Sequence, residues 1–193
     1  FEELKHQLPP YPPNFYYDKR EPEFLKKMHN GLIKFTEDWT EENWGHQAWM
    51  YYRMVEMVDA NVGYILSILE SSNDYENTVI IFSSDHGESN GYHRMLFKDN
   101  FYDTSSKVPT FVSFPKAFKK GRIDDSHLVS GLDFFPTFCD YAGIKPPDDL
   151  KGKSLKPLVE NTAVQWRKYL HAQSKVQHMG HRWAGILTLV EDT

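Results

Sequence analysis

Thr78-Val-Ile-Ile-Phe-Ser83 is a short, unbroken run of mainly β-branched residues, and Ser84-Asp-His-Gly-Glu-Ser-Asn-Gly-Tyr-His93 follows it directly. Such a run is typical of a strand that is covered on both faces. The segment after it begins with a carboxylate and an imidazole side by side, Asp85 and His86. Because ligands in open α/β sheets gather beyond the carboxyl ends of the strands, this position predicts a ligand site.

A long helix is predicted just before this strand. Residues 44–71 carry apolar side chains at i, i+3 and i+4, the spacing of a buried helical stripe, and Thr40 or Asn43 is a suitable N-cap. A helix, a short turn and a buried strand form an α/β unit, from which parallel sheets are usually built. The sequence therefore predicts the α/β class.

Further elements are indicated elsewhere in the chain. Residues 7–23 hold five of the eleven prolines, which predicts an extended segment lying over a surface. Two more strands and a helix are predicted: Pro109 to Pro115 as a short strand, Leu132 to Ala142 as a helix that ends at Gly143, and Trp183 to Val190 as an edge strand.

The composition is that of a globular chain without a basic surface. Of the 193 residues 40% are hydrophobic and 15% aromatic, which excludes a disordered chain. The net charge of -5 argues against a nucleic-acid partner, and the basic residues of one short cluster are interpreted as solvated loop charges: Lys116, Lys119, Lys120 and Arg122. No run of 18 apolar residues occurs, so we expect no membrane span.

The residues after the Thr78–Ser83 strand have the chemistry of an anionic-ester site. An Asp oxygen and a neutral His nitrogen suit a divalent cation, and Lys98 adds a compact positive charge. A metal together with a lysine neutralises the charge of a sulfate or phosphate ester during displacement. Gly87 and Gly91 would allow the sharp turns that gather such groups. The structural alternative is an Asp-His pair that caps a helix and a lysine that is merely solvated.

The order of the motifs resembles a known family. Asp85-His-Gly-Glu88, then Gly91-x-His93, then Lys98 thirteen residues after Asp85, is similar to the second metal-binding motif of type I sulfatases, members of the alkaline-phosphatase-like superfamily. Four more blocks resemble the same family in the same order: Tyr51 to Asp59 with Gly63, Val108 to Val112, Val129 to Gly143, and Leu150 to Leu158.

The resemblance implies a fold and a division of the chain. It implies part of an alkaline-phosphatase-like sheet with helices on both faces, formed by residues 1–145 as the C-terminal part of the catalytic domain. Residues 146–193 would begin a smaller C-terminal subdomain. The N-terminal sequence has neither an initiator Met nor a signal-peptide pattern, so we expect a cut in a longer protein whose N-terminal half is missing.

The resemblance also implies roles for four residues. Asp85 and His86 would be metal ligands, with calcium the usual ion of the family and magnesium or manganese as alternatives. Several related families carry Asn where His86 stands, so this histidine fits a subset of them. Lys98 would bind the sulfate oxygens and act in catalysis. His93 would line the site or assist at the ester, with a structural hydrogen bond as the alternative.

The nucleophile of the resembled family is absent from this sequence. Type I sulfatases use a formylglycine made in a Cys/Ser-x-Pro-x-Arg motif, and no such motif occurs here. The first pair of metal carboxylates is also missing. The single cysteine, Cys139, excludes an intrachain disulfide and is predicted to be a small core residue. We therefore expect the parent protein to be the sulfuric ester hydrolase and this chain alone to be inactive.

The resemblance implies the substrate and location of the parent protein as well. We expect a sulfated small molecule or carbohydrate, hydrolysed by an enzyme in the periplasm or outside the cell, as is the habit of the family. Aromatic residues near the motif would suit a sugar ring, although they would serve equally for packing: Tyr92, Phe101 and Tyr102.

Four other interpretations remain open. One is a phosphonate or phosphate ester hydrolase of the same superfamily, and another is an inactive binding or regulatory module. A third is a hydrolase with Ser89 as nucleophile in Gly87-Glu-Ser-Asn-Gly91, for which Asp133 and His171 would complete a triad. The fourth is a metal site at His178-x-x-His181, where a surface loop is the better interpretation.

Overall fold

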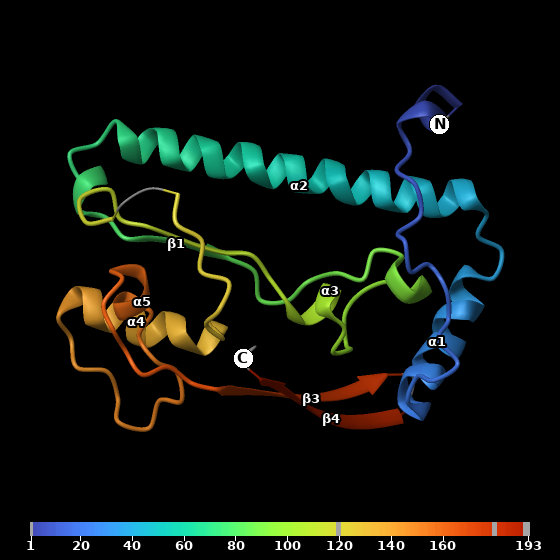
Figure 1. The fold of residues 1–193 in the computed structure, drawn as a ribbon. Helices are drawn as coiled ribbons and strands as arrows, with labels where there is room; N and C mark the ends of the chain where they lie inside the picture. Colours follow the sequence, from blue (N-terminus) through green and yellow to red (C-terminus); the bar gives the residue numbers. More distant parts are fainter. Residues whose placement is uncertain (1, 119–120, 179–180, 191–193) are drawn as a thin grey trace. The chain divides into compact units, whose positions relative to one another are not determined.

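The computed structural model describes residues 2–118, 121–178 and 181–190, and the side chains of residues 174–190 lie outside the description. Helices and strands follow one another along the chain (Figure 1). Contacts divide the chain into two compact units. The first unit contains residues 1–68, 86–108 and 174–184, and the second contains residues 69–85, 109–173 and 185–193.

The first unit is mainly helical. It begins with a short 3₁₀ turn, η1 (Glu2–Gln7), continues with α1 (Glu23–Thr36), and contains most of the long helix α2 (Glu41–Glu70). The predicted helix is confirmed, and so is its cap. The Asn43 backbone N–H donates to the Thr40 hydroxyl at 3.3 Å, and the Thr40 backbone N–H donates to the Asn43 side-chain oxygen at 2.9 Å. This reciprocal pair satisfies donors that a helix start otherwise leaves unpaired.

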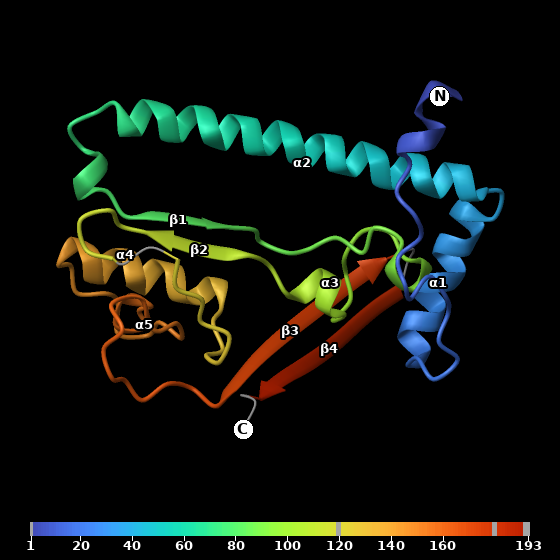
Figure 2. The ribbon, with the colours of Figure 1, turned by 45° about the horizontal axis from the view of Figure 1, so that its top comes forward.

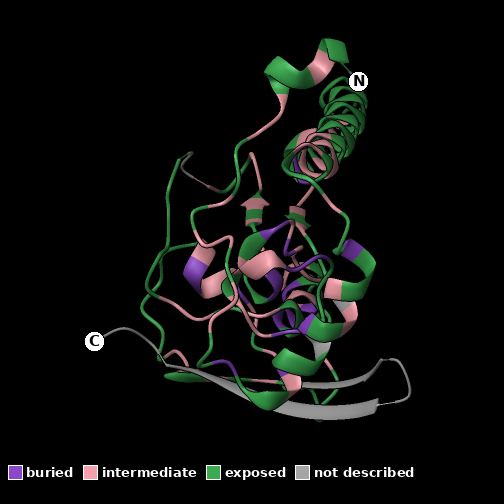
Figure 3. Cartoon of the chain, turned by 90° about the vertical axis from the view of Figure 1, so that its right-hand side faces the viewer, coloured by how far each residue is buried: buried purple, intermediate pink, exposed green. Residues whose placement is uncertain are grey.

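The burial predicted for the stripe on α2 is wrong for this chain. Only Trp44 and Gly45 are buried on α2, whereas Met57, Val58 and Ile65 are 66%, 54% and 63% exposed. Figure 3 shows most of the long helix in the colours of exposed and half-buried residues. The helical spacing of apolar residues indicates a face fit for burial, but it does not indicate which segment covers that face.

The core of the first unit joins four segments that are distant in sequence. Leu25, Trp44, Met95 and Leu96 are buried together, and half-buried Phe15 packs its ring edge against Trp44 at 5.0 Å between centroids. Phe15 belongs to residues 8–22, which contain no helix or strand, as the prolines predicted. The helix α1 was not predicted from the sequence.

A buried polar pair lies beside this core. Nδ1 of His29 on α1 is 2.8 Å from Oε2 of Glu21, and both side chains are 4% exposed. The Tyr102 hydroxyl donates to the other carboxylate oxygen of Glu21. Burial lowers the pKa of His29, and the nearby Glu21 carboxylate opposes this shift without reversing it. The pair therefore ties α1 to the loop that carries Tyr102.

The second unit contains the predicted strands β1 (Ile80–Ser83) and β2 (Thr110–Ser113). They pair antiparallel, with Ile80 opposite Ser113 and Ser83 opposite Thr110 (Figure 2). The expectation of a parallel arrangement is thus wrong for this pair, because a buried apolar run indicates a strand but not its direction. The predicted cover on both faces is also wrong among the described residues, since Phe82 and Phe111 are 38% and 63% exposed.

The remaining elements of the second unit lie before β1 and after β2. They are two 3₁₀ turns, η2 (Tyr75–Asn77) before β1 and η4 (Gly131–Asp133), then α4 (Phe134–Ala142) and α5 (Lys156–Val159). The predicted end of α4 is confirmed, because Gly143 adopts the left-handed φ of 68°. Cys139 on α4 is buried and forms no disulfide in the described structure, as predicted.

Asp133 fastens the segment after α4 to the start of that helix. Its carboxylate is fully buried and accepts hydrogen bonds from both terminal nitrogens of Arg167, at 2.5 and 2.6 Å. The backbone N–H groups of Ser130 and Lys153 donate to the same carboxylate, each at 2.8 Å. These four bonds satisfy the buried charge and define the Asp133 clamp, which joins three stretches of the second unit.

Two further strands, β3 (Tyr169–His178) and β4 (His181–Val190), form a two-stranded sheet. The predicted strand from Trp183 to Val190 is confirmed as part of β4. The two histidines of the His178-x-x-His181 pattern stand at the ends of the two strands, but their side chains lie outside the described residues, so the metal-site interpretation stays untested.

Candidate anionic-ester site

The predicted metal ligands follow β1 directly. Asp85 is exposed and ends the stretch 69–85 of the second unit, whereas His86 is half-buried and opens the loop that belongs to the first unit. His86 Nδ1 is 2.9 Å from the carbonyl oxygen of Gly87. A carbonyl only accepts, so Nδ1 carries the proton in this contact and the lone pair is on Nε2. This is the tautomer in which a histidine offers Nε2 to a metal.

The loop that starts at His86 lies tightly against the segment before β2. The Gly87 N–H donates to the carbonyl oxygen of Ser105 at 2.9 Å. A Cβ atom at position 87 would stand 1.9 Å from the carbonyl oxygen of Thr104, well inside any contact distance. Gly87 is therefore required for a close approach of two backbones. The sequence interpretation, a sharp turn, applies instead to Gly91, whose φ is 92°.

Gly87→Ala is expected to lower the free energy of unfolding by about 3 kcal/mol, because the added methyl group forces the Thr104 backbone away. Urea unfolding measures the change. Gly63→Ala on α2 is the matched control. A Cβ atom there meets nothing within 4 Å, so the same substitution should stabilise the helix by about 0.5–1 kcal/mol. A neutral Gly87→Ala would contradict the close approach.

Ser89 is an internal anchor of this loop. It is 1% exposed, and its hydroxyl lies 3.3 Å from the Asn100 side-chain nitrogen and 3.4 Å from the Ser105 hydroxyl. A nucleophile elbow would place a serine, exposed, before a helix. Here the next helical element is the 3₁₀ turn η3 (Tyr92–Arg94), and Asp133 is fully engaged in its clamp. The hydrolase interpretation with Ser89 is not supported.

The backbone between Ser89 and Asn100 is unusually strained. Five residues other than glycine have positive φ: Asn90 at 41°, His93 at 55°, Arg94 at 53°, Phe97 at 68° and Asp99 at 74°. Residues other than glycine rarely adopt this backbone region, and each one that does costs on the order of 1–3 kcal/mol of conformational free energy. Such a backbone persists only where its surroundings fix it. The sequence indicated a turn at Gly91 but none of these five positions.

Lys98 lies within the strained segment, and its side chain is exposed. Its neighbour Phe97 is held on both sides, because the Phe97 N–H donates to the Glu88 carboxylate at 2.5 Å and the Phe97 carbonyl accepts from the Ser89 N–H at 2.8 Å. The short helix α3 (Asp103–Ser106) closes the loop. His86, His93 and Lys98 thus belong to one unit, while Asp85 belongs to the other.

His93 is packed into the protein. Its ring stacks on Tyr102 at 3.8 Å between centroids and 9° between planes, and its Nε2 lies 3.1 Å from the Asn14 side-chain nitrogen. Because that amide nitrogen only donates, Nε2 accepts and Nδ1 carries the proton. Burial, together with the bond to Glu21, raises the pKa of Tyr102 well above its usual range. Tyr102 is thus held by its stack on His93 and its bond to Glu21, and the role of His93 at an ester stays a prediction.

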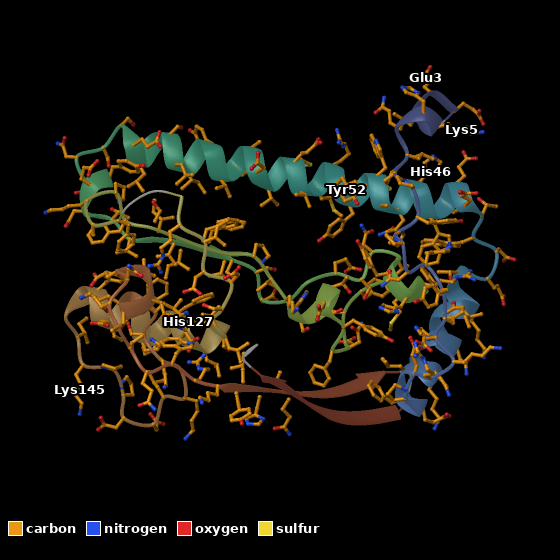
Figure 4. The ribbon with its side chains drawn as sticks, in the orientation of Figure 1. Glu3, Lys5, His46, Tyr52, His127 and Lys145 are labelled. Atoms are coloured by element: carbon orange, nitrogen blue, oxygen red, sulfur yellow. The ribbon has the colours of Figure 1, made fainter. Side chains whose placement is uncertain are left out.

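Several polar groups of the second unit have local partners. His127, labelled in Figure 4, holds its Nδ1 2.9 Å from a carboxylate oxygen of Asp124. Burial raises the pKa of Asp124, but its hydrogen bonds from His127 and Ser126 outweigh burial and lower it. Arg122, from the basic cluster, donates to the carbonyl oxygen of Leu158. These contacts fix loops of the second unit.

The described residues contain no group of three or more His, Cys, Asp or Glu side chains placed to hold a metal. Asp85 and His86 alone do not complete a coordination shell, and their role as metal ligands stays a prediction, for which a carboxylate oxygen and an imidazole nitrogen are suitable atoms. Across residues 2–118, 121–178 and 181–190, no helix has both the length and the apolar character to cross a membrane.

Comparison with known proteins identifies the family. The sulfatase family model matches residues 5–144, and the chain belongs to the sulfatase family. It is 36% identical over 154 residues to an N-acetylglucosamine-6-O-sulfatase of Bacteroides thetaiotaomicron, covering 76% of this chain and 27% of that protein. The chain thus spans about a quarter of the length of this curated relative.

Solved structures confirm the fold. The structure of a 2-O GAG sulfatase superimposes with a TM-score of 0.85 and 27% identity, over 95% of this chain and 41% of that one. A phosphonate monoester hydrolase of Agrobacterium radiobacter gives a TM-score of 0.66 and 32% identity, over 74% of this chain and 28% of that one. The predicted α/β class, as part of an alkaline-phosphatase-like fold, is therefore confirmed.

Proposed function

We propose that this chain is the part of a sulfatase that carries one edge of its metal site and the lysine that binds the sulfate group. The observation that supports this most is the placement of Asp85 and His86 immediately after β1, with Lys98 in the tightly fixed loop that follows. The named sulfatase relatives act on carbohydrates, as N-acetylglucosamine-6-O-sulfatase and 2-O GAG sulfatase. We therefore assign sulfated carbohydrates as the substrate class of the whole protein.

The chemistry assigned to each residue follows from its position and type. Asp85 would bind a divalent metal through carboxylate oxygen and His86 through Nε2, and calcium is the ion we propose. The bound metal would supply charge neutralisation at the sulfate oxygens. The Lys98 ammonium would bind a sulfate oxygen and oppose the negative charge that develops there. The nucleophile, a formylglycine, would come from sequence outside this chain, as would the remaining metal carboxylates.

An exported location and the division at residue 145 belong to the same proposal. A phosphonate ester hydrolase is the second candidate, supported by the 32% identity to the Agrobacterium radiobacter enzyme. A module without activity is the third, supported by the absence of a formylglycine motif from these 193 residues. The three candidate functions differ in which ester, if any, the longer protein hydrolyses.

Paired assays on the longer protein, activated to formylglycine, test the proposal. We expect hydrolysis of a sulfated aryl ester or sulfated glucosamine at least about a hundred times faster, in kcat/KM, than that of the matching phosphonate ester. A calcium chelator should abolish the activity and added calcium should restore it. Faster turnover of the phosphonate would support the second candidate, and no turnover of either with no calcium binding would support the third.

A further inference from the structure

The Glu88 side chain is directed to backbone groups of its own loop. Its Oε1 accepts a hydrogen bond from the Phe97 N–H at 2.5 Å and another from the Asn90 N–H at 3.3 Å. Charged acceptors make the stronger hydrogen bonds, roughly twice those between neutral groups. Because Phe97 directly precedes Lys98, the carboxylate acts one residue away from the lysine assigned to sulfate.

Phe97 needs such a partner. Its φ of 68° is in the left-handed region, which is unfavourable for a side chain as bulky as phenylalanine. Its ring is 55% exposed, so packing of the ring does little to hold this conformation. The conformation is therefore held by two hydrogen bonds of the Phe97 backbone. Its N–H donates to the Glu88 carboxylate, and its carbonyl accepts from the Ser89 N–H. Of these two, only the Glu88 bond comes from a side chain that can be substituted.

We propose that Glu88 is a positioning residue for Lys98. By fixing the peptide between Leu96 and Phe97, it sets the direction in which the chain presents the Lys98 side chain. This inference rests on the proposed function, in which Lys98 binds the sulfate group. It assigns to the glutamate of the Asp85-His-Gly-Glu88 motif a task separate from that of the two metal ligands.

The sign of the electrostatic effect makes the inference testable. A carboxylate close to an anion site repels the anion, so removing its charge should by Coulomb's law alone tighten sulfate binding. Positioning predicts the opposite, weaker binding. Glu88→Ala removes both charge and acceptor, whereas Glu88→Gln removes the charge but keeps an oxygen that can accept from the Phe97 N–H. Asp103→Asn on α3, whose exposed carboxylate pairs with Lys107, is the control for the loss of one charge.

The experiment is a titration of the isotope-labelled longer protein with sodium sulfate, followed by NMR at the Lys98 amide, with hydrogen exchange at the Phe97 amide. In Glu88→Ala we expect about ten-fold weaker sulfate binding and at least ten-fold faster exchange at Phe97, the factor that corresponds to one charge-assisted hydrogen bond. Glu88→Gln should keep most of the sulfate affinity and most of the protection of the Phe97 amide from exchange. Asp103→Asn should leave the Phe97 amide unchanged and should not weaken sulfate binding.

The outcomes separate this inference from the proposed function. The assignment of Lys98 to sulfate fails if Lys98→Ala binds sulfate as tightly as the unsubstituted protein does. It also fails if sulfate changes the NMR signal of residue 98 in neither of these two proteins. If Lys98→Ala loses binding while Glu88→Ala keeps it, the positioning role is overturned and the proposed function stands. Unchanged exchange at Phe97 in Glu88→Ala would also overturn the positioning role, whatever the sulfate result.

Discussion

Asp133→Ala is expected to lower the free energy of unfolding of the second unit by about 3–5 kcal/mol, because it leaves Arg167 without its partner in a buried place. The Asp133 side chain is fully buried and that of Arg167 is only 12% exposed. The substitution also leaves the Ser130 and Lys153 backbone N–H groups without acceptors. Urea unfolding gives the change, and hydrogen exchange at the Lys153 amide locates it in the clamp.

Asp148→Ala is the matched control in the same unit. Asp148 pairs with Lys145, labelled in Figure 4, at 2.8 Å, but these two side chains are 83% and 79% exposed. Exposed pairs of this kind contribute about 0–1 kcal/mol. An Asp133→Ala variant no less stable than Asp148→Ala would show that the Asp133 clamp does not stabilise the fold.

Lys98→Ala is expected to lower kcat/KM for sulfate ester hydrolysis by about 10²–10³-fold in the longer, activated protein, the effect typical of removing one group that opposes developing charge. Lys98 is expected to act on the substrate, so the melting temperature should change little, because its side chain is exposed. Steady-state kinetics and thermal unfolding of the same preparation measure both quantities.

Lys107→Ala controls for the loss of one positive charge. Its ammonium is 2.8 Å from Asp103 on the surface of the same loop region, and its side chain is 65% exposed. We expect kcat/KM to stay within about two-fold, since a screened surface charge contributes little. An equal loss of activity in Lys98→Ala and Lys107→Ala would count against a specific role for Lys98.

Local patterns predicted the elements that depend on neighbouring residues. The caps at Thr40 and Gly143, the strand at Ile80–Ser83 and the helix at Phe134–Ala142 all follow from such patterns. The expectations about which segments pack against each other were wrong. The antiparallel pairing of β1 with β2 and the exposed face of α2 depend on which distant segment is present, and a periodic pattern carries no such information.

The candidate site shows the same division. The residue types and spacing of Asp85, His86 and Lys98 indicated metal and anion chemistry, and the family comparison confirmed the class of protein. The contacts that hold the site residues in place could not be predicted from the sequence. Asp133 was considered as a triad member but is bound to Arg167. Nothing in the sequence marked Glu88 as the hydrogen-bond acceptor for the Phe97 N–H. Both contacts join residues that meet only after folding.

The first unit has a consequence for biosynthesis. Asn14 meets His93 and Glu21 meets Tyr102, pairs separated by 79 and 81 positions along the chain. As the chain leaves the ribosome, α1 and the proline-rich stretch before it therefore emerge long before the loop that covers them. At about 5–20 residues per second, some 4–16 seconds pass between the emergence of Asn14 or Glu21 and that of its partner, an interval in which a nascent chain is open to chaperones and to aggregation.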